Sequence, residues 1–144
     1  MSEILSYLEN IRALDLNENQ NIYFDFLIEN GVLFTEKLPY YHVKKFEVKE
    51  RQCFRNSILT AINCNFEYYE GFYFTDVKIV IEHAFNRIFD NAKVIDVTAE
   101  KFNISVFEWF GVEVPQNILN EFLRSKYNGV LSPLQYYFRF HINK

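Results

Sequence analysis

The chain has 144 residues and a formal net charge of -4 at pH 7, and 49% of its residues are hydrophobic and 19% aromatic. This length fits one domain spanning residues 1–144, and the composition supports a packed core rather than a disordered chain. With 15 Lys and Arg against 19 Asp and Glu and no long basic cluster, the sequence argues against a nucleic-acid partner.

No stretch approaches the roughly 18 apolar residues that a membrane-spanning helix needs. The first residues, MSEILSYLENIRALD, are acidic and amphipathic rather than typical of a signal peptide. We therefore expect a cytoplasmic protein with no membrane partner. Delivery into a host cell stays open, as does the oligomeric state.

Two amphipathic helices are predicted at the N-terminus, over residues 2–12 with Ser2 as the cap and over residues 19–30. The second is expected to end at Gly31, where glycine can adopt the left-handed conformation. The pattern breaks up over residues 32–51, which predicts a loop with a short strand at the alternation of Val43, Lys45 and Glu47.

A third helix is predicted over residues 53–64, with one apolar face formed by Phe54, Ile58, Ala61 and Ile62. It begins at Cys53 and ends at Cys64, so about 16 Å of helix separates the two sulfurs. A disulfide needs Cα atoms within about 7 Å of each other. Both cysteines are therefore expected to be free thiols.

Aromatic and alternating residues predict an antiparallel sheet after this helix. The run FEYYEGFYF is typical of a strand with a bulge or bend at Gly71. In the next run, VKIVIEHAFN, alternation places His83 on one face with Ile81 and Phe85. A hairpin turn over residues 89–92 follows, because Asp and Asn tolerate the conformations that such turns need.

The hairpin fixes an expected register. If residues 89 and 92 pair, opposite residues sum to 181, so His83 faces Thr98 and Asp96 lies diagonally on the same face. Diagonal neighbours have Cα atoms about 7 to 8 Å apart, a gap that an imidazole and a carboxylate can bridge.

The C-terminal part is predicted to hold a strand and two helices. The run ISVFEWFGVEV is typical of a strand broken at Gly111, and a helix follows from Pro115 to about Tyr127, with Gly129 as its stop. A last helix is expected after Ser132-Pro133. The predicted fold class is α+β, with the Cys53 helix packed on an antiparallel sheet and flanking helices.

Cys53, His83 and Asp96 could form a thiol-based catalytic triad. A cysteine in the first turn of a helix lies near the positive end of the helix dipole, which favours the thiolate. A nearby imidazolium would add to this effect, and a carboxylate would orient the imidazole. Each residue alone also has an ordinary structural explanation: a small buried thiol, a core histidine and a loop cap.

Other sites have weaker support. Cys53, Cys64 and His83 show no paired metal-ligand spacing, so no metal or other cofactor is expected. No glycine-rich phosphate loop is present. His42 and His141 are isolated and are expected at the surface, and Glu82 should point away from His83. A group of tyrosines either lines a cleft or packs within the sheet: Tyr68, Tyr69 and Tyr73.

Four motifs in this order resemble the papain-like and transglutaminase-like cysteine hydrolase superfamily, especially small bacterial and phage members. They are Tyr69-Glu70-Gly71, His83-Ala84-Phe85, Asp96-Val97-Thr98 and Trp109-Phe110-Gly111-Val112, and they follow QCxxN at the cysteine. The resemblance covers residues 52–114 and implies that fold, with Cys53 as nucleophile, His83 as general base and acid, and Asp96 as orienting residue.

The chain departs from this pattern at Phe85 and Val97, where the relatives usually carry Trp and Pro. It also has Glu47 where the papain type places its oxyanion glutamine upstream of the cysteine. Gln52 or the Cys53 backbone N–H would have to supply the oxyanion contact, with Asn56 as a further candidate facing the site.

These observations predict a cysteine-dependent hydrolase or acyltransferase that acts through an acyl-enzyme on an amide or thioester. Its partner would be a protein, a peptide or another acyl donor. The alternative is a non-catalytic binding or inhibitor protein of phage or bacterial origin that keeps the fold. The sequence leaves open the substrate and the choice between hydrolysis, acyl transfer and deamidation.

Overall fold

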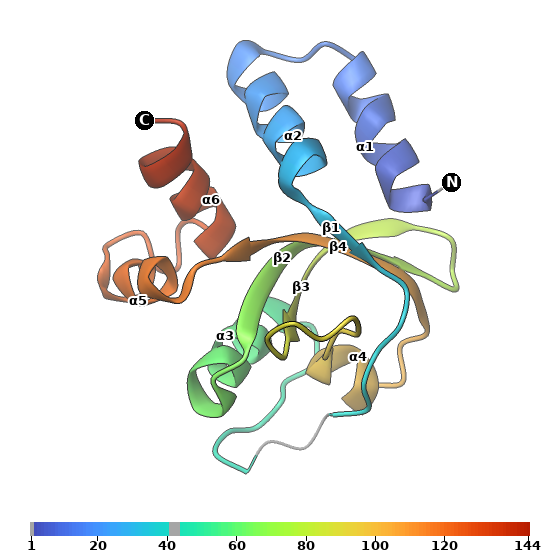
Figure 1. The fold of residues 1–144 in the computed structure, drawn as a ribbon, viewed down its shortest axis with the longest axis vertical. Helices are drawn as coiled ribbons and strands as arrows, with labels where there is room; N and C mark the ends of the chain where they lie inside the picture. The colour runs from blue at the N-terminus through green and yellow to red at the C-terminus, as the bar shows by residue number, and fades with distance from the viewer. Residues whose placement is uncertain (1, 41–43) are drawn as a thin grey trace.

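The computed structural model describes residues 2–40 and 44–144. Within these ranges the chain is α+β, with six α-helices and one antiparallel sheet of four strands in the order β1-β4-β2-β3. Figure 1 shows helices α1 and α2 on one side of the sheet and α3 and α4 on the other. In the described ranges, no helix is long and apolar enough to cross a membrane.

The N-terminal helices form as the sequence predicts. Helix α1 spans Glu3–Ala13 with Ser2 as its N-cap, and α2 spans Glu18–Asn30 with Asn17 as its N-cap. Gly31 ends α2 in the extended region, at φ -74°, and not in the left-handed conformation that we expected. Glycine is needed there because a Cβ atom would lie 2.1 Å from the ring of Phe110.

The next segment holds a short strand in a different place from the predicted one. Strand β1, Val32–Phe34, pairs with β4 at the edge of the sheet. Residues 44–46 form a turn and a bend, Glu47 has no regular structure, and Val43 and His42 lie outside the described residues. The predicted strand at this alternation is therefore wrong for its described part.

Helix α3 has the predicted bounds, Cys53–Cys64, and part of the predicted buried face, since Ala61 is buried and Phe54 and Ile58 pack against the core. Its buried residues are mainly polar: Asn56, Ser57, Thr60 and Ala61. Ile62, which we expected in the core, is 47% exposed. The polar residues can be buried because they find partners; for example, the Thr60 hydroxyl donates to the Asn56 carbonyl at 2.7 Å.

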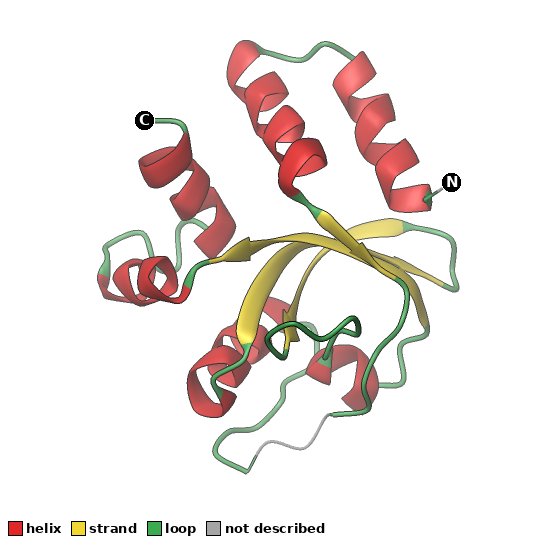
Figure 2. Ribbon diagram, viewed as in Figure 1, coloured by secondary structure: helices red, strands yellow, loops and turns green. Residues whose placement is uncertain are grey.

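The three long strands of the sheet are β2 (Glu67–Thr75), β3 (Val80–Arg87) and β4 (Val106–Val114), which appear as yellow arrows in Figure 2. Strands β4 and β2 lie at the centre, and β3 lies at an edge. Gly71 and Gly111 lie directly opposite each other in regular pairing, so the expected bulge and break are absent there. A Cβ atom on Gly71 would come within 2.1 Å of the Phe110 carbonyl oxygen. These glycines therefore allow two strands to approach closely.

The hairpin register is correct, but its second arm is not a full strand. Asn86 and Ile95 exchange both backbone hydrogen bonds at 2.8 Å, in agreement with the predicted sum of 181. The chain then turns into helix α4, Val97–Lys101. Asp96 therefore lies at a helix N-terminus and not on a strand, and Thr98 lies in α4 instead of opposite His83.

Three short helical segments complete the chain. Helix α5 spans Gln116–Arg124 and ends before the predicted stop at Gly129. Helix α6, Pro133–Tyr137, begins at a capping box on Ser132 and continues as a π-helical turn over Phe138–Ile142. Side chains from α5 and α6 pack with those of α1 and α2 in the larger core, on the face of the sheet that lies opposite His83.

Candidate active site

The side chain of His83 lies in the interior against the sheet face that α3 and α4 cover. It is 2% exposed, and its strand position pairs with Gly71, so no side chain stands opposite it on β2. The neighbouring Tyr73 ring fills the space beside it. The two rings are parallel, with an angle of 4° between their planes and 3.8 Å between their centroids.

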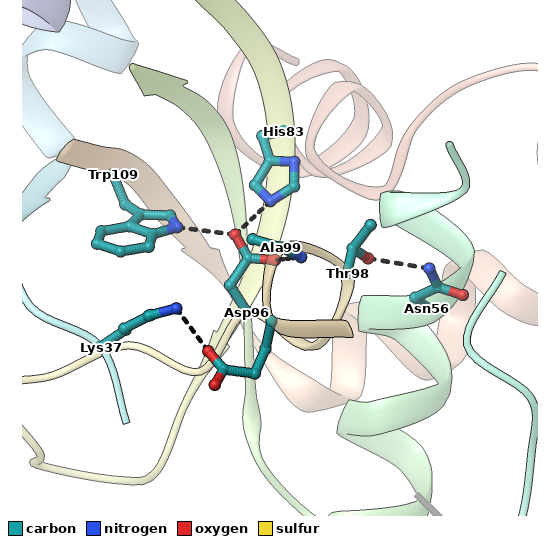
Figure 3. A network of polar contacts seen from close by, with 8 residues as sticks. Lys37, Asn56, His83, Asp96, Thr98, Ala99 and Trp109 are labelled. Carbon is teal, nitrogen blue, oxygen red and sulfur yellow. Dashed lines mark hydrogen bonds and ion pairs between the residues drawn. The ribbon is translucent and has the colours of Figure 1, made fainter. Parts of the chain in front are cut away.

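Asp96 receives three hydrogen bonds, which Figure 3 shows. Its Oδ2 atom accepts from His83 Nε2 at 2.6 Å and from Trp109 Nε1 at 2.8 Å. Its Oδ1 atom accepts from the Ala99 N–H at 3.0 Å, which is the N-cap bond of α4. Asp96 is thus fixed both by a helix end and by the sheet, so its carboxylate can hold the imidazole in one orientation.

The pKa values of this buried pair move apart. Burial lowers the pKa of His83, but the Asp96 charge and hydrogen bonds to Asp96 and Cys53 raise it, and the result is a pKa of about 9. Burial also raises the pKa of Asp96, but the His83 charge and the bonds from His83, Trp109 and Ala99 outweigh it and lower that pKa. Near neutral pH the pair is therefore an imidazolium and a carboxylate.

Cys53 lies beside this ion pair. It is the first residue of α3, it is partly exposed, and it lines the same cavity as His83 and Tyr73. Because His83 Nε2 is bonded to Asp96, the ring nitrogen left for the thiol is Nδ1. Cys64 is also free and lies at the far end of α3, where its sulfur is 3.6 Å from the Tyr40 hydroxyl.

The first turn of α3 is open at its N-terminus. Gln52 is the N-cap residue, but its side chain makes no capping hydrogen bond, and it is exposed. The first N–H groups of a helix have no partner within the helix, so the backbone N–H of Cys53 is available to a ligand near the sulfur. This arrangement favours the backbone N–H over the Gln52 side chain as the oxyanion donor.

Asn56 is fully buried and connects α3 to two other segments. Its Nδ2 group donates to the Lys49 carbonyl at 2.7 Å and to Thr98 Oγ1 at 2.9 Å, and its Oδ1 accepts from the Lys49 N–H at 3.0 Å. An amide has only two N–H donors, and both are used here. Asn56 is therefore placed to hold the Cys53 helix against α4, and it has no N–H left to donate to an oxyanion.

The remaining predicted candidates lie away from this ion pair or at its edge. Glu82 is exposed at the rim of the cavity. His141 is not isolated, since its Nε2 lies 2.7 Å from Glu121 Oε2. Among the described residues, no group of three or more His, Cys, Asp and Glu side chains could hold a metal ion.

Two site residues were not predicted in their roles. Trp109 was noted only as part of a motif, although its place on β4 opposite Tyr73 puts both on one sheet face. Tyr73 was one of three tyrosines with open roles, and the structure separates them. The Tyr69 ring stacks on Phe85. The Tyr68 hydroxyl donates to Glu70, and these two residues lie on the opposite face of the sheet. Of the three tyrosines, only Tyr73 lines the cavity.

Comparisons with protein-family models, with curated proteins and with solved structures found no match to this chain. The site must therefore be interpreted from its own geometry.

Proposed function

We propose that the protein is a cysteine-dependent hydrolase or acyltransferase that works through an acyl-enzyme on Cys53. The observation that carries this proposal is the buried His83–Asp96 pair beside a helix-terminal thiol in one cavity. A structural core histidine needs only a satisfied hydrogen bond. Here the ring is also fixed by Tyr73, Asp96 by Trp109 and Ala99, and a cavity opens at the thiol.

The proposed reaction uses the charged His83–Asp96 pair. The Cys53 sulfur attacks the carbonyl carbon of the substrate as a thiolate, and the C=O electron pair moves to oxygen beside the backbone N–H of Cys53. When the tetrahedral intermediate collapses, the bond to the leaving nitrogen or sulfur breaks, and His83 gives that atom its proton. A second nucleophile, water or an amine, then attacks the thioester while His83 removes its proton, and the C–S bond breaks to release the acyl product and the Cys53 thiolate.

The same geometry supports a relationship to the papain-like and transglutaminase-like superfamily. Of the three site residues, Cys53 comes first in the chain, at the start of helix α3. His83 follows on the antiparallel strand β3, and Asp96 comes after the hairpin turn. The placement of Asp96 on a helix cap and the order β1-β4-β2-β3 are the features that a related structure would have to share.

The proposal is tested by treating the protein with activated acyl esters and mapping the acyl group by peptide mass spectrometry. We expect one acyl group, on Cys53, in the wild type and in a Cys64→Ala variant. Cys53→Ala should accept none. Acylation of Cys53 no faster than that of free cysteine would contradict the proposal and would favour the non-catalytic binding protein.

A further inference from the structure

The cavity at the thiol has a volume of about 520 Å³, which is large for a site that needs only to admit water. It is bounded by α3, by the facing strands β2 and β3, and by the segment that joins α4 to β4. The volume of this cavity therefore indicates that it accepts a part of the substrate larger than water.

Most of the lining side chains near the reacting atoms are apolar or aromatic. They are Phe54, Tyr73, Ile81, Phe102 and Ile104. Ile81 is 39% exposed, and Phe102 and Ile104 are half-buried, so the empty cavity leaves apolar surface in contact with water. Apart from His83, whose charge is paired with Asp96, the charged residues of the lining are Glu50, Arg51 and Glu82, which are exposed and belong to the rim.

This apolar lining is held in place by the fold. Ile81 lies two residues before His83, so alternation puts both side chains on the same face of β3. The Phe102 and Ile104 backbones are bonded to α4, through Phe102 N–H to the Thr98 carbonyl at 3.1 Å and Ile104 N–H to the Ala99 carbonyl at 2.9 Å. Asp96 caps the same helix, so α4 positions both the apolar lining residues and the carboxylate that bonds His83.

We propose that this cavity binds the acyl side of the substrate, and that the group next to the scissile carbonyl is an apolar chain or ring. This inference rests on the proposed function of Cys53. An acyl group whose carbonyl carbon reaches the thiol extends into the space between Ile81, Phe102 and Ile104. A charged acyl group there would lose hydration without gaining a partner, because His83 is already paired with Asp96 and the other charged lining residues are at the rim.

The test is a series of 4-nitrophenyl esters from acetyl to hexanoyl. In each reaction a C–S bond forms at Cys53, the ester C–O bond breaks and 4-nitrophenolate leaves, so absorbance reports one acylation per protein. Rates are divided by the rate of free cysteine with the same ester to remove intrinsic reactivity. We expect each added methylene to raise the corrected rate by up to about fourfold.

Two variants locate the preference. Ile81→Ser, at a partly exposed position that the fold should tolerate, and Phe102→Ser are each expected to lower the hexanoyl-to-acetyl ratio by several-fold. Ile79→Ser is the matched control, since Ile79 is also exposed and close in sequence but does not line the cavity, and its ratio should equal that of the wild type.

The outcomes separate this inference from the proposed function. Rapid acylation of Cys53 with equal corrected rates along the series would overturn the apolar pocket and leave the catalytic thiol standing. A preference that survives both Ile81→Ser and Phe102→Ser would also overturn it. No acylation of Cys53 by any ester would contradict the proposed function, and the inference with it.

Discussion

The phenol ring of Tyr73 lies parallel to the imidazole of His83 at a centroid distance of 3.8 Å. Stacking of this kind limits rotation of the histidine about its side-chain bonds, while Asp96 fixes the in-plane direction. Tyr73 and Asp96 therefore restrain the imidazole from two directions, so its remaining nitrogen, Nδ1, points in one fixed direction.

Tyr73→Ala should remove this restraint and slow acylation of Cys53 by about tenfold, in line with the loss of a positioned acid–base group. Tyr73→Phe keeps the ring and should restore most of the rate. The measurement is the burst rate with an activated ester, together with its pH profile. If the hydroxyl were the important group, Tyr73→Phe would be as slow as Tyr73→Ala.

Asp96→Asn tests the charge of the carboxylate separately from its shape. The amide oxygen can still accept from Ala99 or Trp109, but the negative charge that raises the pKa of His83 is lost. The pKa of His83 should fall, and the acylation rate should fall by about 10³-fold or more. NMR titration of the imidazole and burst kinetics measure the two effects.

The matched control for this change is Asp90→Asn in the hairpin turn. Asp90 is exposed and has φ 62°, a conformation that asparagine also adopts readily. It should keep the wild-type pKa of His83 and the wild-type rate. An Asp96→Asn protein that matched this control would remove Asp96 from the mechanism.

The His83–Asp96 pair should also make stability depend on pH. The folded pKa of His83, about 9, lies above the ordinary value of 6.5, so the folded state binds this proton more tightly. The stabilisation is fully present below pH 6.5 and is lost as pH rises through 9. The shift corresponds to roughly 2 to 4 kcal/mol. Urea unfolding at pH 7 and pH 10 should show this loss in the wild type and not in His83→Gln.

Glu70 provides a second pH effect, on the opposite face of the sheet. Burial raises its pKa to about 7, although the Ser132 hydroxyl, the Leu134 N–H and the Tyr68 hydroxyl bond to it. Because this pKa lies above the ordinary 4.5, the wild type should lose stability as pH rises from 4.5 to 7. Glu70→Gln lacks the titrating group and should not show this loss.

Urea unfolding of the wild type and Glu70→Gln at pH 5 and pH 8 measures this effect. Glu9→Gln, in the exposed part of α1, is the control and should follow the wild type. Equal pH dependence in Glu70→Gln and the wild type would show that Glu70 does not titrate in this range.

The sequence predicted the proximity of His83 and Asp96 better than it predicted the contacts that hold them in place. Alternation and the hairpin turn were enough to place His83 and Asp96 together, and the bridge between Asn86 and Ile95 has the predicted register. The sequence did not distinguish a hairpin strand from a helix N-cap at Asp96. The residues Val97-Thr98-Ala99 after it are compatible with both, and the hydrogen bond from the Ala99 N–H identifies Asp96 as the N-cap.

The features that the sequence did not predict, the paired glycines and the buried Asn56, depend on contacts between distant segments. Because glycine weakens a strand, the sequence predicts a bulge or bend at Gly71 and a break at Gly111. In the structure the two glycines are directly paired on the neighbouring strands β2 and β4. The apolar periodicity of α3 predicts a buried face that includes Ala61, but it does not predict Asn56, which is buried through bonds to Lys49 and Thr98. Periodicity within one helix cannot reveal partners that lie on other elements.

The central proposal is that His83 activates the thiol of Cys53. The direct measurement is the rate of alkylation by iodoacetamide at pH 7, read separately at Cys53 and Cys64 by peptide mass spectrometry. We expect Cys53 to react faster than Cys64 in the wild type, and to lose this advantage in His83→Gln. A Cys53 rate equal to that of Cys64, or unchanged in His83→Gln, would contradict the account.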